Sequence, residues 1–384
     1  MMKKMKLTVQ SLKIFYVFTF FMNLFVGMLF LGIPLLALKL GANNVALGAI
    51  GTLGSLVYIL CVPVSGIFAD RFPKNLQAGL AAILFGITVC LIPSVPRLSL
   101  LYPVVVGYFI SLALVWPALE STMSHYFSGP ALSRTAGWYN VSWCSGAMVG
   151  IYLAGWIYGI KPELVFWIAG GLGIILGAVF AGFFRVPAKK AESENGSEFG
   201  PIYYLYLYWL GNGAAYFSLN LIRNIFPKLA VDLGISSSSL GLLLLLLSLA
   251  QCLLFIVLNV AVRWHFRFWP LLAAMLLNTA GLLVVFVSKN MPGFGIGFLL
   301  IGAGAGITYS GSLYYAISLS SSRAGSRSGW HEFYLGLGAL WGPLLGGLFA
   351  QYVSPESPYL FSAFLVIAIL IVQVFYYRKK TRPA

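Results

Sequence analysis

Long apolar runs, each close to the length of a membrane-spanning helix, recur throughout this 384-residue chain. A run of about 20 apolar residues is long enough for a helix to cross the hydrocarbon core of a bilayer. In lipid, only helices and closed barrels satisfy every backbone N–H and C=O group, and the alternating pattern of a barrel strand is absent here. We therefore predict an all-α polytopic membrane protein with twelve transmembrane helices, at residues 14–38, 44–66, 76–93, 99–122, 133–159, 162–184, 201–225, 237–261, 267–287, 291–318, 329–351 and 357–377.

The distribution of charge supports this class. Hydrophobic residues make up 60% of the chain and charged residues only 9%, which is not the composition of a soluble protein. Eighteen of the Lys and Arg residues lie in the loops that share a side with both termini, five lie in the other loops, and Arg223 lies within a run. This bias predicts a multi-pass protein of the plasma (cytoplasmic) membrane with both termini in the cytoplasm, and no nucleic-acid partner.

A polar connection divides the apolar runs into six and six. Residues 188–200 have the composition of a flexible linker, so we predict an N-terminal six-helix bundle at 1–187, a cytoplasmic linker at 188–200 and a C-terminal six-helix bundle at 201–384. Two groups of residues recur between the halves. Pro34, Gly41 and Gly48 match Pro227, Gly234 and Gly241 at a spacing of 193, and Gly146, Gly150 and Gly155 match Gly338, Gly342 and Gly347 at a spacing of 192. Parallel repeats of this kind predict two bundles with a substrate site between them near the bilayer midplane.

One short charged turn, GIFADRFPKN at 66–75, lies between two long apolar runs. Charge this close to a membrane is costly unless it is paired or hydrated, so we expect the turn to act as a latch. It resembles the motif Gly-x-x-x-Asp-Arg-x-Gly-Arg-Lys/Arg of the major facilitator superfamily. The matching positions are Gly66, Asp70, Arg71 and Lys74, whereas Pro73 and Asn75 depart from the motif.

A second resemblance lies in GLGALWGPLLGG at 336–347, which is similar to the family pattern Gly-x-x-x-Gly-Pro-x-x-Gly-Gly. In proton-coupled drug exporters of the superfamily this pattern belongs to span five, where the present chain has Ile151 in place of the proline. Small residues allow close helix approach, and a proline allows a kink. The predicted helix-packing residues are Gly146, Gly150, Gly338, Gly342, Pro343 and Gly346.

The resemblance also implies a cytoplasmic latch, in which Asp70 faces the start of span eleven and Lys74 meets Glu120 on span four. Pairs of Glu332 with Arg134 and of Glu120 with Arg327 would give an inner gate. The predicted latch and gate comprises Asp70, Arg71, Lys74, Glu120, Arg134, Arg327, His331 and Glu332. Two other interpretations of the acids stay open. Either acid could carry a proton, or both could lie near the headgroups and only cap helices.

Polar residues nearer the middle of the runs are candidates for the substrate cavity. They are Asn23, Asn140, Trp143, Asn212, Asn220, Arg223, Gln251 and Tyr309. Arg223 could anchor an anionic group, or its side chain could extend to the outer interface. The amides could instead join helices as structural hydrogen-bonding groups.

The sequence contains none of the enzyme motifs GxxxxGK[ST], HExxH and GxSxG, and the spacing of its cysteines indicates neither a disulfide framework nor a metal site. We therefore predict a secondary active transporter that moves a small solute by alternating access, without a cofactor and as a monomer in the lipid bilayer, with coupling to protons as a hypothesis. The alternatives are a lipid-acting membrane protein, such as a scramblase or enzyme, and an uncoupled facilitator.

Overall fold

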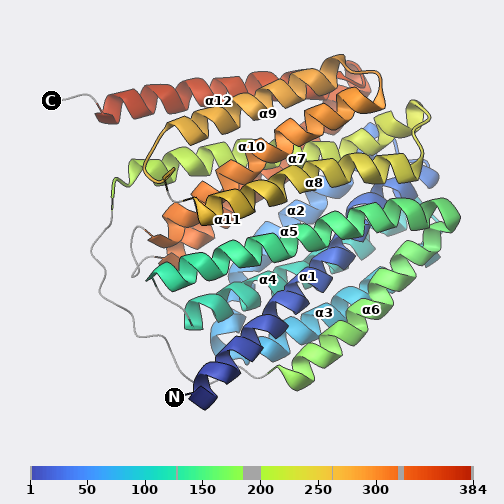
Figure 1. Cartoon of the computed structure of the whole chain (residues 1–384). Coiled ribbons are helices and arrows are strands. Elements are labelled where there is room, and N and C mark those ends of the chain that lie inside the picture. Colours follow the sequence, from blue (N-terminus) through green and yellow to red (C-terminus); the bar gives the residue numbers. More distant parts are fainter. Residues whose placement is uncertain (1, 127–128, 185–199, 262, 319–323, 382–384) are drawn as a thin grey trace. The chain divides into compact units, whose positions relative to one another are not determined.

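The computed structural model describes residues 2–126, 129–184, 200–261, 263–318 and 324–381 (Figure 1). Helices are the regular elements in this part of the chain. They are α1 (Met2–Lys39), α2 (Asn44–Arg71), α3 (Lys74–Leu91), η1 (Ile92–Ser94), α4 (Leu98–Tyr126), α5 (Gly129–Ile160), α6 (Pro162–Phe183), α7 (Tyr203–Asp232), α8 (Ser237–Val260), α9 (Trp269–Val287), α10 (Met291–Ser318), α11 (Ala324–Tyr352) and α12 (Ser357–Thr381). The prediction of an all-α polytopic membrane protein is confirmed.

Several helices begin before the apolar run that predicted them. α1 begins at Met2 rather than at residue 14, α5 at Gly129 rather than at 133, and α11 at Ala324 rather than at 329. An apolar run marks the part of a helix that lipid can hold, whereas polar turns can extend the same helix beyond it. The extra turns of α11 place Arg327 on the helix instead of in a loop.

Helix α7 differs from the others in composition. Among the described residues, eleven helices are long and apolar enough to cross a membrane, and α7 is not one of them. It carries Asn212, Asn220, Arg223 and Asn224 within its length, yet most of its residues are buried. We infer that α7 contacts protein on nearly every face, because a helix surrounded by protein can hold polar side chains that lipid would exclude.

By their internal contacts the residues fall into two compact units. The first consists of Met1–Gly41 and Leu56–Glu192, and the second of Ala42–Ser55 and Ser193–Ala384. The first half of α2 therefore groups with the second unit, although it precedes the predicted boundary. The predicted linker at 188–200 lies outside the described residues except for Gly200, so the boundary there stays a prediction.

The turns α1–α2 and α7–α8 share one construction at the spacing of the sequence repeat. Each preceding helix is followed by a glycine with positive φ, Gly41 at 86° and Gly234 at 70°. Each following helix is capped by a side-chain oxygen that accepts the N–H three residues ahead, from Asn43 at 2.9 Å and from Ser236 at 3.2 Å. A glycine after one helix and an Asn or Ser before the next explain why the repeat keeps these residue types.

In the first unit, α1 and α5 pack with their backbones in contact. A Cβ atom on Gly146 would overlap the carbonyl oxygen of Phe20, and one on Gly150 would overlap that of Leu24. Real Cβ atoms do not approach a backbone oxygen so closely, so only glycine fits at these two positions.

In the second unit, α7 and α11 pack in the same manner. A Cβ atom on Gly338 would overlap the carbonyl oxygen of Gly213, and one on Gly342 would overlap that of Phe217. The two contacts on α7 lie 193 residues after their counterparts on α1, and the glycines of α11 lie 192 residues after those of α5. The sequence repeat therefore corresponds to the same helix pair, built twice.

Candidate functional site

The proline of α11 leaves one backbone acceptor without its usual partner. Pro343 has no N–H, so it cannot bond to the carbonyl group of Ala339 one turn earlier. In the second unit, the hydroxyl oxygen of Ser55 on α2 lies 2.9 Å from that carbonyl oxygen and also 2.9 Å from the carbonyl oxygen of Gly51 in its own helix. Thr52, one turn earlier on α2, donates to the carbonyl oxygen of Leu340 at 3.1 Å. Side chains of α2 therefore hydrogen-bond to α11 at the level of its proline.

Glycines bring these two helices into backbone contact. A Cβ atom on Gly48 would lie 2.5 Å from the carbonyl oxygen of Pro343, and one on Gly347 would lie 2.5 Å from that of Asn44. Both distances are too short for a real Cβ atom. On another face of α11, Gly346 meets side chains of α7. The small residues thus place the hydroxyl groups of α2 within reach of the α11 carbonyls.

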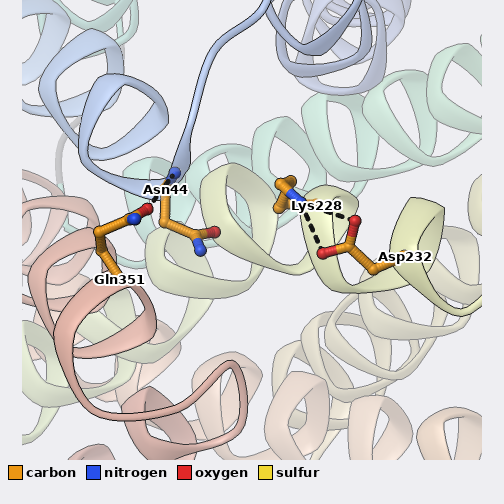
Figure 2. Close-up of polar contacts among 4 residues, drawn as sticks. All are labelled: Asn44, Lys228, Asp232 and Gln351. Atoms are coloured by element: carbon orange, nitrogen blue, oxygen red, sulfur yellow. Dashed lines mark hydrogen bonds and ion pairs between the residues drawn. The ribbon is translucent and has the colours of Figure 1, made fainter.

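A further hydrogen bond joins the start of α2 to the end of α11 (Figure 2). The N–H of Asn44 belongs to the first turn of α2, where backbone N–H groups have no partner within the helix. It donates to Oε1 of Gln351 on the last turn of α11 at 3.3 Å (Figure 2). The same figure shows a separate ion pair within α7, where Nζ of Lys228 lies 2.6 Å from both carboxylate oxygens of Asp232. We call the contact of residues 44–55 with residues 339–351 the α2–α11 seam.

A histidine is enclosed in the interior of the second unit. His331 on α11 is 1% exposed, and its Nδ1 lies 2.6 Å from the hydroxyl oxygen of Ser312 on α10. Among the described residues its Nε2 has no hydrogen-bond partner, and Oε1 of Glu332 lies 3.8 Å from it. The ring of Tyr309 stands edge-on to the imidazole at 5.0 Å between ring centres. The imidazole is therefore held at Nδ1, with a carboxylate beside Nε2.

Two charged side chains of α11 accompany this histidine. Arg327 lies one turn before it and is buried, and the side chain of Glu332 is 16% exposed. An imidazole and a carboxyl group this close titrate as a pair, so a single proton can reside on either group. The pair of His331 and Glu332 therefore has the chemistry needed to take up and release one proton.

Aromatic rings from neighbouring helices lie beside this pair. The ring of Tyr309 on α10 is 5.8 Å from that of Tyr216 on α7 and 5.4 Å from that of Phe255 on α8. Gln251, one turn before Phe255, is fully buried. Apolar rings with a few polar groups are typical of sites that bind small organic molecules.

The polar residues of α7 are satisfied mainly within the helix. The side-chain amide of Asn220 donates to the carbonyl oxygen of Tyr216 at 2.9 Å, and that of Asn224 donates to the carbonyl oxygen of Asn220 at 2.8 Å. Asn212 is fully buried, and neither of its amide atoms has a hydrogen-bond partner among the described residues. Arg223 is 7% exposed, so its side chain is largely surrounded by protein.

The hydrogen bond of Ser55 gives a testable coupling to Pro343. We expect Ser55→Ala to lower the free energy of unfolding by about 1 kcal/mol, because it leaves the Ala339 carbonyl group without a donor. In a Pro343→Ala background, the backbone N–H at position 343 can make that bond itself, so the same substitution should have a smaller effect. A double-mutant cycle of unfolding free energies measures the difference, and effects that add to within about 0.3 kcal/mol would contradict the assignment.

Comparison with known proteins identifies the family. The family model described as Major Facilitator Superfamily matches residues 15–203 and 208–384. The chain belongs to the major facilitator superfamily. A similar protein, Multidrug resistance protein 1 of Bacillus subtilis (strain 168), is 18% identical over 364 residues, which cover 88% of this chain and 90% of that protein.

Solved structures show the same superfamily fold. A bacterial homolog of the human lysosomal transporter Spinster, in an inward-facing and unoccupied conformation, has a TM-score of 0.69 at 15% identity. The superposition covers 97% of this chain and 96% of the homolog. The human organic anion transporter MFSD10 has a TM-score of 0.70 at 14% identity, and the match covers 94% of this chain and 98% of that transporter. The nucleoside transporter NupG has a TM-score of 0.74 at 12% identity, and the match covers 96% of this chain and 100% of that transporter. At these identities the likeness shows the fold alone.

In this member of the superfamily, the charged turn between α2 and α3 folds back on the helix before it. Nζ of Lys74 donates to the carbonyl oxygen of Ala69 at 3.0 Å. Pro73 (φ −58°, ψ 119°) is the residue before α3, and Lys74 begins that helix. The pairing of Lys74 with Glu120, which the family resemblance implies, stays a prediction. Asp70 has its side chain outside the described residues.

The two positions that depart from the superfamily motif have structural roles of their own. Pro73 sets the turn, and the side-chain amide of Asn75 donates to the carbonyl oxygen of Ala181 at the end of α6, at 3.2 Å. Arg71 is exposed. An amide that binds α6 therefore replaces the second base of the motif and fixes α3 within the first unit.

The candidate cavity residues of the first unit lie on α1 and α5. Asn23 is buried and its amide donates to the carbonyl oxygen of Thr19 at 3.0 Å. Nε1 of Trp143 donates to Oδ1 of Asn140, one turn earlier on α5, at 3.2 Å. Arg134, near the start of α5, is exposed. These hydrogen bonds of Asn23 and Asn140 thus lie within one helix each, α1 and α5.

Several predicted gate contacts would join the two units. They are Asp70 with the start of α11, Glu332 with Arg134, and Glu120 with Arg327. All three stay predictions.

The sequence did not predict the contacts of Ser55 and Thr52 with α11 or that of Ser312 with His331. A signal existed for the first of them, since Pro343 within a helix always leaves the carbonyl group four residues earlier in need of a donor. The sequence could not show which helix supplies that donor. Ser312 lies 19 residues from its partner His331 and on another helix, so no local pattern connects them.

Proposed function

We propose that this protein is a secondary active transporter that moves a small organic solute across the cytoplasmic membrane by alternating access, with protons as the coupling ion. Membership of the superfamily supports transport. One observation supports proton coupling: the buried imidazole of His331 and the partly buried carboxylate of Glu332 lie 3.8 Å apart on a helix of the second unit. An uncoupled facilitator would not need such a pair, and nothing in the family match favours a lipid-acting enzyme or scramblase.

The proposed solute has an aromatic or other apolar surface. The rings of Tyr216, Phe255 and Tyr309 offer apolar contact beside the proton-binding pair. The names of similar proteins support a solute of this kind, since they include a multidrug resistance protein, an organic anion transporter and a nucleoside transporter. We further propose that the protein acts as a monomer, and that both termini lie in the cytoplasm, since the distribution of Lys and Arg favours this orientation.

Thermal stabilisation against a panel of compounds tests this proposal. The panel contains nucleosides, organic anions and cationic amphipathic drugs, each added to the purified protein in detergent. A compound present at 100 times its Kd stabilises the folded state by about 2.7 kcal/mol, which is well above the resolution of the method. We expect stabilisation by at least one aromatic compound and a weaker effect on a Tyr309→Ala variant. Stabilisation that is equal in the variant would remove Tyr309 from the site.

A further inference from the structure

The turn between α8 and α9 is the counterpart of the charged turn in the first unit, but its chemistry is different. Residues 263–269 read RWHFRFW, and Arg263 lies 193 residues after Asp70. The second copy therefore has a base in place of the acid, and aromatic residues between two arginines. A turn that has lost its acid cannot act as the same latch, so its basic and aromatic residues call for another explanation.

This turn is held in one conformation by the second unit. Nε1 of Trp264 donates to the carbonyl oxygen of Leu258 at 3.0 Å, and the N–H of Phe266 donates to the hydroxyl oxygen of Tyr315 at 2.8 Å. The ring of His265 stacks on that of Tyr314, with 3.9 Å between centres and 7° between planes. Phe266 has a φ of 53°, a left-handed conformation that a bulky residue adopts only where its surroundings impose it.

The last turn of α12 lies against the same structure. The ring of Phe268 stacks on that of Tyr377 at 4.4 Å between centres. Tyr377 is followed directly by three exposed bases, and both arginines of the α8–α9 turn are also exposed. We call these five bases, Arg263, Arg267, Arg378, Lys379 and Lys380, the basic collar.

The positive charge of the collar has no acidic neighbour in its own segments. The described acids of the second unit are Asp232, Glu332 and Glu356, and neither 263–269 nor 376–381 contains one. Asp232 pairs with Lys228 and Glu356 pairs with Lys289. Burial lowers the pKa of His265, so this ring is neutral at pH 7 and the charge resides on the Arg and Lys side chains.

Large apolar side chains flank the collar and are exposed. They include Val260 at the end of α8, Trp269 at the start of α9 and Phe375 on α12. In a membrane protein such residues face lipid, and Trp is enriched at the level of the headgroups. The bases therefore lie where phosphate groups of lipids are found. Arginine binds phosphate with two parallel N–H donors, which a fixed turn can aim and a flexible loop cannot.

We propose that the basic collar binds the headgroup of an anionic phospholipid in the adjacent leaflet. The phosphate lies between the arginines of the α8–α9 turn and the bases of α12, and the acyl chains run along the exposed apolar faces of α8, α9 and α12. This site is independent of the solute and proton sites proposed above.

Reconstitution of the full chain into nanodiscs of two compositions tests the proposal. One contains phosphatidylcholine alone, and the other contains equal parts of phosphatidylcholine and phosphatidylglycerol. We expect the anionic lipid to raise the unfolding midpoint of the wild-type protein by about 3 °C or more, and added salt to reduce the rise. The Arg263→Gln/Arg267→Gln variant and the Arg378→Gln/Lys379→Gln/Lys380→Gln variant should each lose at least half of it.

Two controls make the result decisive. The Arg97→Gln/Lys161→Gln variant removes two exposed bases from turns of the first unit and should keep the full rise. Addition of soluble glycerol phosphate to phosphatidylcholine nanodiscs should give no rise. Equal rises in the wild-type protein and in both collar variants would overturn the proposal, because general attraction to a charged surface would then suffice. A full rise with soluble glycerol phosphate would instead assign the collar to a water-soluble phosphate compound.

Discussion

Replacing Gly342 with valine is expected to destabilise the protein by about 3 kcal/mol, the upper end of measured overpacking costs. The glycine has no room for a side chain, because a Cβ atom would overlap the carbonyl oxygen of Phe217 on α7. Backbone atoms on both helices form the contact, so no side chain can rotate away to relieve it. Gly150→Val should have a comparable effect in the first unit, where the overlap is with Leu24. Chemical unfolding of the purified variants in detergent measures the change.

Gly171→Val provides the matched control. Gly171 also lies within a helix, and a Cβ atom there would meet nothing within 4 Å. The Gly171→Val substitution changes helix propensity by the same amount as Gly342→Val, so the difference in unfolding free energy between the two variants measures the effect of the overlap alone. A Gly342→Val protein as stable as Gly171→Val would contradict the close packing of α7 and α11.

Replacing Glu332 with glutamine is expected to abolish accumulation of the solute against its gradient. Glutamine is similar in shape but cannot bind and release a proton. One coupled proton supports about tenfold accumulation per pH unit across the membrane, and loss of the proton site reduces this ratio to about one. Exchange of labelled for unlabelled solute needs no net proton movement and should persist. Both quantities are measured in proteoliposomes with an imposed pH gradient, using a solute found in the stabilisation panel. His331→Gln should weaken accumulation as well, because it removes the other half of the pair.

Glu356→Gln serves as the control for this experiment. The ammonium group of Lys289 donates a hydrogen bond to the Glu356 carboxylate and lowers its pKa, so this carboxyl stays charged over the working range of pH. Its replacement should leave accumulation unchanged. If Glu332→Gln accumulated solute as well as Glu356→Gln did, the proton would have to bind elsewhere.

Much of the fold could be predicted from the sequence because its determinants are local or periodic. Apolar runs predicted the twelve helices, and the spacing of Gly146 and Gly150 against Gly338 and Gly342 predicted two equivalent halves. The structure adds the reason for that spacing, since both glycine pairs meet backbone oxygens at equivalent positions of α1 and α7. The polar extensions of α1, α5 and α11 were missed because hydrophobicity reports the membrane boundary and not the end of a helix.

The site could be predicted only in part, because its contacts depend on distant segments. His331 and Glu332 stood out as polar residues near an apolar run, but nothing local indicated that Ser312 would hold the imidazole. The family resemblance implies a pairing of Lys74 with Glu120, which stays a prediction, and the structure adds a hydrogen bond from Lys74 to the carbonyl oxygen of Ala69. Arg223 could have been read as interfacial or interior, and only its burial on α7 favours the interior.

The most direct test of proton-coupled transport is the proton movement that accompanies solute entry. Proteoliposomes holding a pH-sensitive dye, with no nucleotide and no imposed gradient, receive a solute that stabilises the purified protein. Proton coupling predicts an immediate change of internal pH with the wild-type protein, and none with Glu332→Gln, although the variant still exchanges solute. Solute uptake by the wild-type protein without any change of internal pH would contradict it.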